Sequence, residues 1–209
     1  MYQYKKKTIA QFTGEAETYD SRFVTVSADY PEILAELEKE PAVDVLDCGC
    51  GSGALLASLH ERHPEMRCTG LDLTPKMIEV AEGRGLEGAE FLVGDCENLP
   101  FAEKSFDAVI CSHSFHHYPS PQSFFNSVFR VLRPGGRLIL RDNTGSRWFL
   151  WYSNHIGIPL THILNDMGDV KYYSRKEVEA FCRRAGLEFV LFEERPNHKM
   201  HCVARRPKT

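Results

Sequence analysis

The chain has 209 residues, which fits one α/β domain and is long enough to bury a sizeable core. Its formal net charge is −4 with the histidines neutral, and this balance argues against a dedicated nucleic-acid binder, which usually has a basic face. No apolar run approaches membrane-spanning length, and no signal-peptide core follows Lys5–Lys7. We therefore expect a cytoplasmic monomer or homodimer that engages neither nucleic acid nor membrane.

The seven cysteines are spread over apolar segments, and their odd number favours free buried thiols in a reducing compartment. Cys48 and Cys50 are separated by one residue rather than two, and no second Cys or His pair stands at zinc spacing. We expect no metal site. The basic runs Lys5–Lys7 and Arg205–Lys208 are interpreted as solvated terminal segments.

Thr8–Glu40 is predicted to be a helical cap, with Pro31 at a helix start and Pro41 just before the first strand. Strand and helix patterns then alternate. Strands are predicted near residues 43–48, 67–72, 89–93, 106–111, 136–141, 187–193 and 199–204. Helices are predicted near residues 53–62, 75–82, 121–132 and 175–185, with caps at Thr74, Ser120 and Ser174. This alternation predicts one α/β domain over residues 1–209, with a mostly parallel sheet and helices on both faces.

The segment Thr144–Lys171 interrupts that alternation. Five of its residues, mostly aromatic, fall at helical spacing and share one face: Trp148, Trp151, Tyr152, His155 and Pro159. Two interpretations remain open. The segment is either a helix that packs an aromatic stripe on the core, or a lid over the substrate, because insertions at strand carboxyl ends line the ligand crevice.

A glycine-rich turn follows the first predicted strand. In VDVLDCGCGSGA, Val43–Ala54, the apolar run ends in Asp47 and breaks into Gly49, Gly51 and Gly53 before a helix-like pattern begins. Strand, glycine turn and helix in this order present backbone N–H groups to a nucleotide-like ligand. The second strand ends in Asp72, about 20 residues further on, where a carboxylate reaches a pair of ribose hydroxyls.

The turn alone is ambiguous. Gly49, Gly51 and Ala54 also satisfy the dinucleotide pattern G-x-G-x-x-G/A, so a nicotinamide-dependent enzyme is an alternative. An acid just before the first glycine, as Asp47 is, suits a ligand with an ammonium group better than an anionic pyrophosphate.

Three downstream motifs occur in a fixed order: GDCENLPF at 94–101, FDAVICSHSFHHY at 106–118 and RVLRPGGRLIL at 130–140. Together with the glycine turn they resemble class I S-adenosylmethionine-dependent methyltransferases, particularly the small-molecule group that includes the ubiquinone and menaquinone biosynthesis enzymes. The resemblance implies a Rossmann-like doubly wound sheet of seven strands with an antiparallel last strand. It also implies methyl transfer from S-adenosylmethionine to a small-molecule acceptor by in-line displacement. A catalytically silent S-adenosylmethionine or S-adenosylhomocysteine-binding protein is a further alternative.

The resemblance also implies which residues bind the cofactor. The glycine turn approaches the methionyl group, Asp47 orients the turn or the ammonium, and Asp72 accepts the ribose hydroxyls. The remaining implied contacts are Leu73 and Met77 on the adenine faces, Asp95 and the Cys96 N–H on the adenine edge, Ser112 near the sulfonium, Tyr19 closing over the cofactor, and Cys50 within the turn.

Histidines follow the fourth predicted strand, where the acceptor is expected. His113 or His117 is a candidate general base, because imidazole exchanges protons near neutral pH. The alternative is that His116 and His117 match the histidine pair that orders this loop in the resembled family.

Overall fold

The core of the protein is a seven-stranded sheet with strand order β3-β2-β1-β4-β5-β7-β6. The structure is a computed structural model that describes residues 2–22, 27–164 and 167–209. The strands are β1 Asp44–Cys48, β2 Arg67–Asp72, β3 Ala89–Val93, β4 Phe106–Ser112, β5 Leu132–Asn143, β6 Glu188–Arg195 and β7 Lys199–Arg205. The first five are parallel, whereas β7 lies antiparallel between β5 and β6. The predicted fold class is confirmed.

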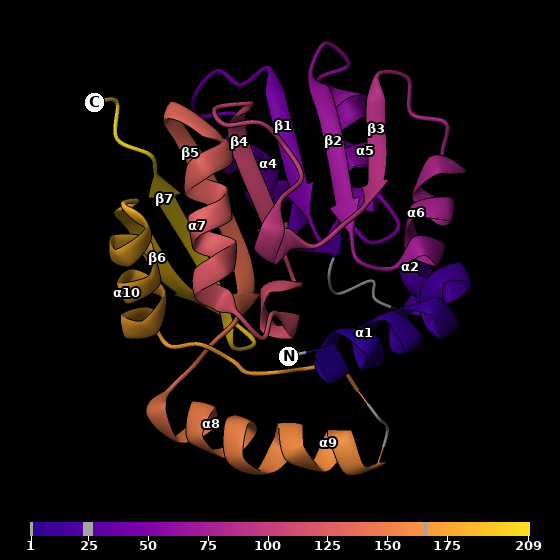
Figure 1. The fold of residues 1–209 in the computed structure, drawn as a ribbon, viewed down its shortest axis with the longest axis vertical. Coiled ribbons are helices and arrows are strands. Elements are labelled where there is room, and N and C mark those ends of the chain that lie inside the picture. The colour runs from indigo at the N-terminus through magenta and orange to yellow at the C-terminus, as the bar shows by residue number, and fades with distance from the viewer. Residues whose placement is uncertain (1, 23–26, 165–166) are drawn as a thin grey trace.

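Helices cover both faces of this sheet (Figure 1). They are α4 Tyr30–Leu37, α5 Ala54–Arg62, α6 Pro75–Glu82, α7 Pro121–Val131 and α10 Arg175–Ala185. Successive strand residues point to opposite faces, so Leu46 packs with Phe124 and Phe125 of α7. Its neighbour Val45 packs with Leu56 of α5 on the other face. Burial on both faces explains why consecutive residues of the central strands are apolar, as in Ala108–Cys111 of β4.

The predicted helix starts are observed, but their caps differ. Ser174 and Glu177 form the expected capping box at the start of α10. Thr74 and Ser120 occupy the N-cap positions of α6 and α7 without a side-chain capping bond. In both helices proline at the first turn supplies the signal instead, because its fixed φ favours helix initiation.

The N-terminal helical region starts earlier than predicted, with α1 at Tyr2–Glu15, followed by η1 Ala16–Thr18 and α2 Tyr19–Arg22. Residues 23–26 of the predicted segment lie outside the described residues. Helix α1 crosses the carboxyl ends of the parallel strands (Figure 1). No helix among the described residues combines the length and apolarity that a membrane crossing requires.

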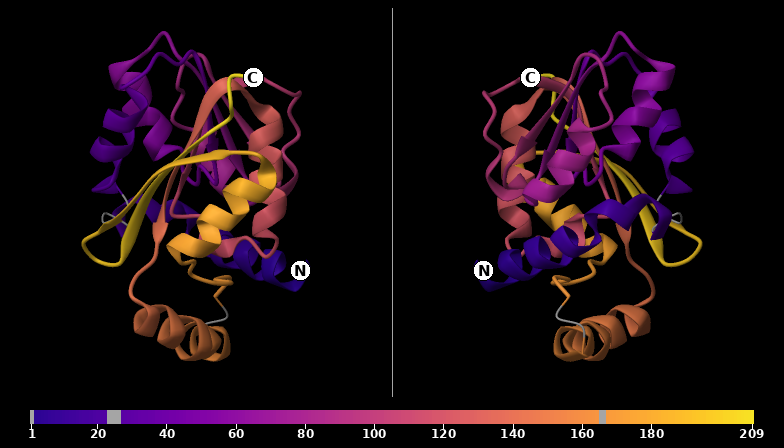
Figure 2. Two further views of the ribbon diagram at one scale, coloured as in Figure 1. Left: turned by 90° about the vertical axis from the view of Figure 1, so that its left-hand side faces the viewer. Right: turned by 90° about the vertical axis from the view of Figure 1, so that its right-hand side faces the viewer.

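The insertion after β5 forms a helical rod outside the sheet–helix sandwich, beyond α1 (Figures 1 and 2). It consists of α8 Arg147–Tyr152, the π-helical η4 Ser153–Gly157 and α9 Ile158–Leu164. Residues 165–166 lie outside the described residues. Trp148 is 82% exposed and Trp151 51% exposed, so the interpretation of the stripe as core packing is wrong.

The interpretation of the basic runs as solvated is also wrong for three of their residues. Lys5 forms ion pairs with Asp95 and Glu97. Arg205 pairs with Glu40, and the Arg206 guanidinium donates to the carbonyl oxygens of Phe129, Arg130 and Leu132. All seven cysteines are free and buried, as expected.

Candidate active site

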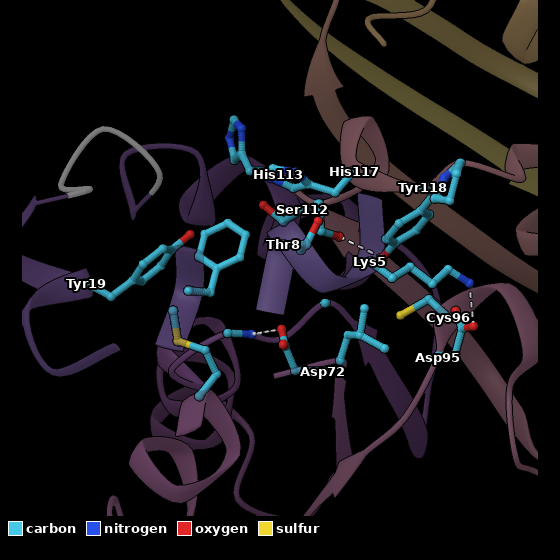
Figure 3. A pocket seen from close by; sticks show the side chains of 17 residues that line it. Lys5, Thr8, Tyr19, Asp72, Asp95, Cys96, Ser112, His113, His117 and Tyr118 are labelled. Atoms are coloured by element: carbon cyan, nitrogen blue, oxygen red, sulfur yellow. Dashed lines mark hydrogen bonds and ion pairs between the residues drawn. The ribbon is translucent and has the colours of Figure 1, made fainter. Parts of the chain in front are cut away.

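A pocket of about 620 Å³ opens at the carboxyl ends of β1, β2 and β4 (Figure 3). A smaller pocket behind the glycine turn shares its wall at Gly49, Gly51 and Ser112. Every site residue predicted from the sequence lines one or both pockets: Tyr19, Asp47, Gly49, Cys50, Gly51, Asp72, Leu73, Met77, Asp95, Cys96, Ser112, His113 and His117.

Two glycines of the turn have different environments. Gly49 has φ +75°, and a Cβ there would lie 2.3 Å from the Oγ atom of Ser114. Gly51 has φ +53°, and the nearest atom to a Cβ there would be in the Tyr19 ring, at 3.7 Å. Glycine at position 49 is therefore required by packing. Gly51 instead keeps its backbone accessible to the pocket.

Asp72 is tied to the turn. Its Oδ2 accepts a hydrogen bond from the Gly51 N–H at 3.0 Å, and its Oδ1 accepts one from the Thr74 N–H at 2.8 Å. Burial raises the pKa of Asp72, although these backbone donors partly oppose the shift. The carboxylate thus joins the glycine turn to the start of α6, and each oxygen retains acceptor capacity toward the pocket.

Two polar atoms in the wall of the smaller pocket, Asp47 Oδ1 and Ser112 Oγ, are buried without a hydrogen-bond partner among the described residues, and His117 Nδ1 in the wall of the larger pocket is a third. Burial raises the pKa of Asp47 to about 7, and the nearby Asp72 adds to the shift. Buried polar atoms in native proteins normally have partners. These two atoms therefore indicate where a ligand with hydrogen-bond donors would bind.

Helix α1 supplies part of the pocket wall, which the sequence reasoning missed. Lys5, Thr8 and Phe12 all line the pocket. The Lys5 Nζ donates to Asp95 Oδ2 at 2.5 Å (Figure 3). Asp95 Oδ1 also accepts from the Glu97 N–H, so this acid caps η2 Cys96–Asn98. No local pattern could reveal a contact between residues 90 positions apart.

Tyr19 lies beside the glycine turn, with its ring 3.7 Å from the position of a Cβ at Gly51. Asp20 next to it bonds both Ser52 and Arg84, and these bonds hold α2 against the turn and the end of α6. Burial raises the pKa of Tyr19 to about 12, with a further contribution from Asp72. The phenol therefore stays protonated at neutral pH and remains available as a donor.

The two predicted general bases differ in their surroundings. His113 is in the left-handed region at φ +52°. Its Nε2 lies 2.6 Å from Asp29 Oδ2, and its Nδ1 lies 3.0 Å from Lys199 Nζ. Burial, with a smaller contribution from the neighbouring His116, lowers the pKa of His117 to about 4. His113 is thus engaged at both ring nitrogens, and His117 is neutral at pH 7.

Comparison with known proteins identifies the part of the chain that holds the glycine turn and most of the pocket: residues 46–140 match the family described as "Methyltransferase domain". Over 146 residues the chain is 35% identical to the demethylmenaquinone methyltransferase of Thermotoga maritima, covering 66% of this chain and 62% of that relative. Over 137 residues it is 38% identical to the malonyl-(acyl-carrier protein) O-methyltransferase of Hahella chejuensis, covering 65% of this chain and 49% of the relative. These matches identify residues 46–140 as a methyltransferase domain, and the chain resembles class I S-adenosylmethionine-dependent methyltransferases.

Solved structures agree with this methyltransferase fold. A S-adenosylmethionine-dependent methyltransferase from Aquifex aeolicus superposes with a TM-score of 0.67 at 22% identity, covering 85% of this chain and 89% of that one. The cofactor of the family is S-adenosylmethionine. Neither a nicotinamide enzyme nor a catalytically silent binding protein is favoured by these matches. The chain spans only 62% and 49% of the lengths of the two relatives, so likeness alone does not assign their acceptors to it.

The raised pKa of Asp47 predicts how the stability of the ligand-free methyltransferase depends on pH. This carboxyl titrates near 3.8 in an unfolded chain and at about 7 in the folded one. Its contribution to stability is complete below about pH 4 and is lost as the pH rises through about 7, because the folded state must then bury a charge. The Asp47→Asn variant does not ionise. The melting temperature of the variant minus that of the wild type is therefore expected to be at least about 4 °C larger at pH 8 than at pH 5.

Thermal unfolding of both proteins at the two pH values measures this difference. The comparison cancels the shared titrating groups that do not interact with Asp47. A gap between variant and wild type that stays the same at pH 5 and pH 8 would show that Asp47 is already ionised in the folded protein.

Proposed function

We propose that this chain transfers the methyl group of S-adenosylmethionine to a small-molecule acceptor. The observation that carries the proposal is the pair of unpartnered buried atoms, Asp47 Oδ1 and Ser112 Oγ, beside a glycine turn whose Gly51 backbone is open to the pocket. S-adenosylmethionine brings an ammonium group and a sulfonium to this position. A cation there satisfies the Asp47 carboxylate and lowers its pKa.

The rest of the pocket fits the rest of the cofactor. Asp72 remains able to accept from ribose hydroxyls, and charge-assisted hydrogen bonds of this kind contribute about 1.5–3 kcal/mol each. Leu73 and Met77 offer apolar surface for the adenine. Asp95 and the backbone of Cys96 lie at the opposite end of the pocket from Tyr19, where the adenine edge is proposed to bind (Figure 3).

In this proposal the protein accelerates methyl transfer mainly by positioning the reacting groups. In-line displacement at a sulfonium needs the acceptor, the methyl group and the sulfur held collinear in a site that excludes water, and such positioning is worth about 7–11 kcal/mol. His113 is engaged at both ring nitrogens, and His117 with a pKa of about 4 takes up a proton poorly at neutral pH. The proposal therefore requires no general base from either residue.

The acceptor is proposed to be a small molecule on two grounds. The net charge of −4 gives no basic footprint for a nucleic acid. The relatives' names specify demethylmenaquinone in one case and malonyl-(acyl-carrier protein) in the other. Because these acceptors differ, the proposal extends to the class of reaction and not to one acceptor.

The proposal predicts that Asp72→Ala weakens binding of S-adenosylhomocysteine at least tenfold, about 1.4 kcal/mol. The substitution removes the ribose acceptor and also frees the Gly51 N–H. Isothermal titration measures the affinity, with Glu90→Gln on the exposed side of β3 as a control that loses a carboxylate outside the pocket. The wild type is expected to give no binding heat with NAD. Equal affinity of Asp72→Ala and wild type would remove Asp72 from the site, and NAD binding would restore the nicotinamide alternative.

A second prediction compares two glycines with the same backbone conformation. Gly51→Val places a branched side chain toward Tyr19 in the pocket, whereas Gly85→Val, at φ +62°, has no atom within 4 Å of its Cβ. Both variants pay a similar penalty for positive φ, about 1–2 kcal/mol. Only Gly51→Val is expected to lose S-adenosylhomocysteine binding. A folded Gly51→Val protein that binds normally in calorimetry would show that the turn does not contact the ligand.

We further propose that the N-terminal helices and the 144–171 insertion act together as a lid over the cofactor. Helix α1 lines the pocket directly, and Thr8 and Gln11 bond the backbone of Gly168. The rings of Tyr4 and His162 also meet, with centroids 5.5 Å apart. Because these contacts join the two segments, cofactor binding under α1 is expected to order both.

Hydrogen exchange with and without S-adenosylhomocysteine tests the lid. Amides of α1 and of the segment around Gly168 are expected to become at least about tenfold more protected with ligand, because lids open locally at low free-energy cost. Amides of the central strand β4 serve as the internal control and should change little. Equal protection of α1 in the two states would overturn the lid.

A further inference from the structure

Three side chains of types that commonly bind metal ions converge beside the pocket, and none of them is among the proposed cofactor contacts. His116 and His117 come from η3 Phe115–His117, and Asp169 comes from the segment after α9. One ligand atom from each lies within 4.8 Å of the other two. We propose that His116, His117 and Asp169 bind a divalent transition-metal ion.

The first argument is the orientation of His116. Its Nδ1 lies 2.7 Å from Asp142 Oδ1, and its backbone N–H donates to Asp142 Oδ2 at 3.1 Å. A proton on Nδ1 shared with this carboxylate leaves the Nε2 lone pair free, and Nε2 lies 3.7 Å from Asp169 Oδ1. Metal-binding histidines almost always donate their other ring N–H to a carboxylate, a carbonyl or water in this way.

The second argument is a buried polar atom without a partner. The His117 side chain is only 6% exposed. Its Nδ1 makes no hydrogen bond in the part of the chain that the structure describes. This Nδ1 lies 3.4 Å from Asp169 Oδ1 without hydrogen-bond geometry. A cation between the two atoms would satisfy both.

The distances suit a small transition metal. Ligands that surround zinc tetrahedrally at 2.0–2.1 Å lie about 3.4 Å from one another. The separation of His117 Nδ1 and Asp169 Oδ1 has this value, and that of His116 Nε2 and the same oxygen exceeds it by a few tenths of an ångström. Two imidazole nitrogens and one carboxylate favour ions such as Zn²⁺, Mn²⁺ or Fe²⁺ over Mg²⁺, which prefers oxygen.

The charges also balance. Asp142 and Asp169 each contribute a negative charge next to the two rings. A divalent ion with both histidines neutral makes the cluster electrically neutral. The competing arrangement, with a protonated His116 between the two carboxylates, leaves one negative charge uncompensated within the cluster.

Three protein ligands leave a coordination position for water or for an oxygen or nitrogen of an acceptor. His117 lines the cofactor pocket, so the ion would lie close to its wall. The backbone N–H of Val170 donates to the His116 carbonyl at 2.8 Å. The ion would therefore fasten the segment around Asp169 to η3 beside the methyl-transfer site.

Metal titration of the full chain tests the proposal. Protein stripped with a chelator is titrated anaerobically with Zn²⁺, Mn²⁺, Co²⁺ and Mg²⁺, and bound metal is measured by calorimetry and elemental analysis. One transition-metal ion per chain is expected, with Mg²⁺ at least tenfold weaker. The Co²⁺ protein should show d–d bands without a thiolate charge-transfer band, which excludes the cysteines as ligands.

Variants in two different elements localise the site. Asp169→Asn and His117→Gln are each expected to weaken metal binding at least tenfold, and Asp142→Asn about tenfold as a positioning change. His155→Gln, an exposed histidine of η4, is the matched control and should bind as the wild type does. Far-UV circular dichroism and a cooperative thermal transition report the folding of Asp169→Asn, because Asp169 lies in the segment that is proposed to close over the cofactor.

The proposal is supported if the wild type binds one transition-metal ion per chain and folded Asp169→Asn or His117→Gln protein loses this binding. Three results would overturn it: no stoichiometric binding to the wild type, a thiolate band in the Co²⁺ protein, or wild-type affinity in Asp169→Asn and His117→Gln. Each of these leaves the proposed methyl transfer standing, because S-adenosylhomocysteine affinity is measured separately on the same proteins.

Discussion

The structure depends on two acidic residues buried side by side where neighbouring strands end. Asp47 lies next to last in β1 and Asp72 last in β2, and the strands are in parallel register, with Cys48 opposite Leu71. The Leu71 carbonyl accepts from the N–H groups of both Gly49 and Cys50, which brings the glycine turn back over the second strand. Burial and the nearby Asp72 raise the pKa of Asp47 to about 7, so this carboxyl is partly protonated in the ligand-free protein. The proposed cationic cofactor would lower that pKa again.

Much of the sheet and its helices could be predicted because local signals agreed with the global fold. Burial on both faces gives β4 its apolar run Ala108–Cys111, and proline at position 75 and the Ser174–Glu177 box mark helix starts. Strand β5 begins at Leu132 rather than near residue 136, because Leu132 pairs with Phe106 ahead of the apolar stretch. The sequence also pointed to residues that line the pockets, since strand-end acids and turn glycines occupy positions fixed by the parallel sheet.

Contacts between distant segments could not be predicted. Arg141 bonds Asp29 across 112 positions, and Asp29 in turn holds His113. Local periodicity also showed that the insertion has an aromatic face. It did not show what this face contacts, and Trp148 is exposed in the structure. The histidine pair is visible in the sequence, whereas Asp169 lies more than fifty positions later, and only the folded chain brings it near. Such residues depend on tertiary packing, which leaves no regular spacing.

The place of β7 has a consequence for how the chain is made. Strand β5 hydrogen-bonds to β4 on one side, and its other neighbour is β7, which ends at Arg205. On the ribosome, strands β1 to β5 emerge before that partner has been synthesised. The nascent chain therefore carries an unprotected apolar strand edge along Leu138–Leu140, whose side chains are fully buried in the finished sheet. Edges of this kind pair with other chains. The interval between translation of β5 and translation of β7 is thus the period in which a chaperone or a slow initial collapse must shield the half-built sheet.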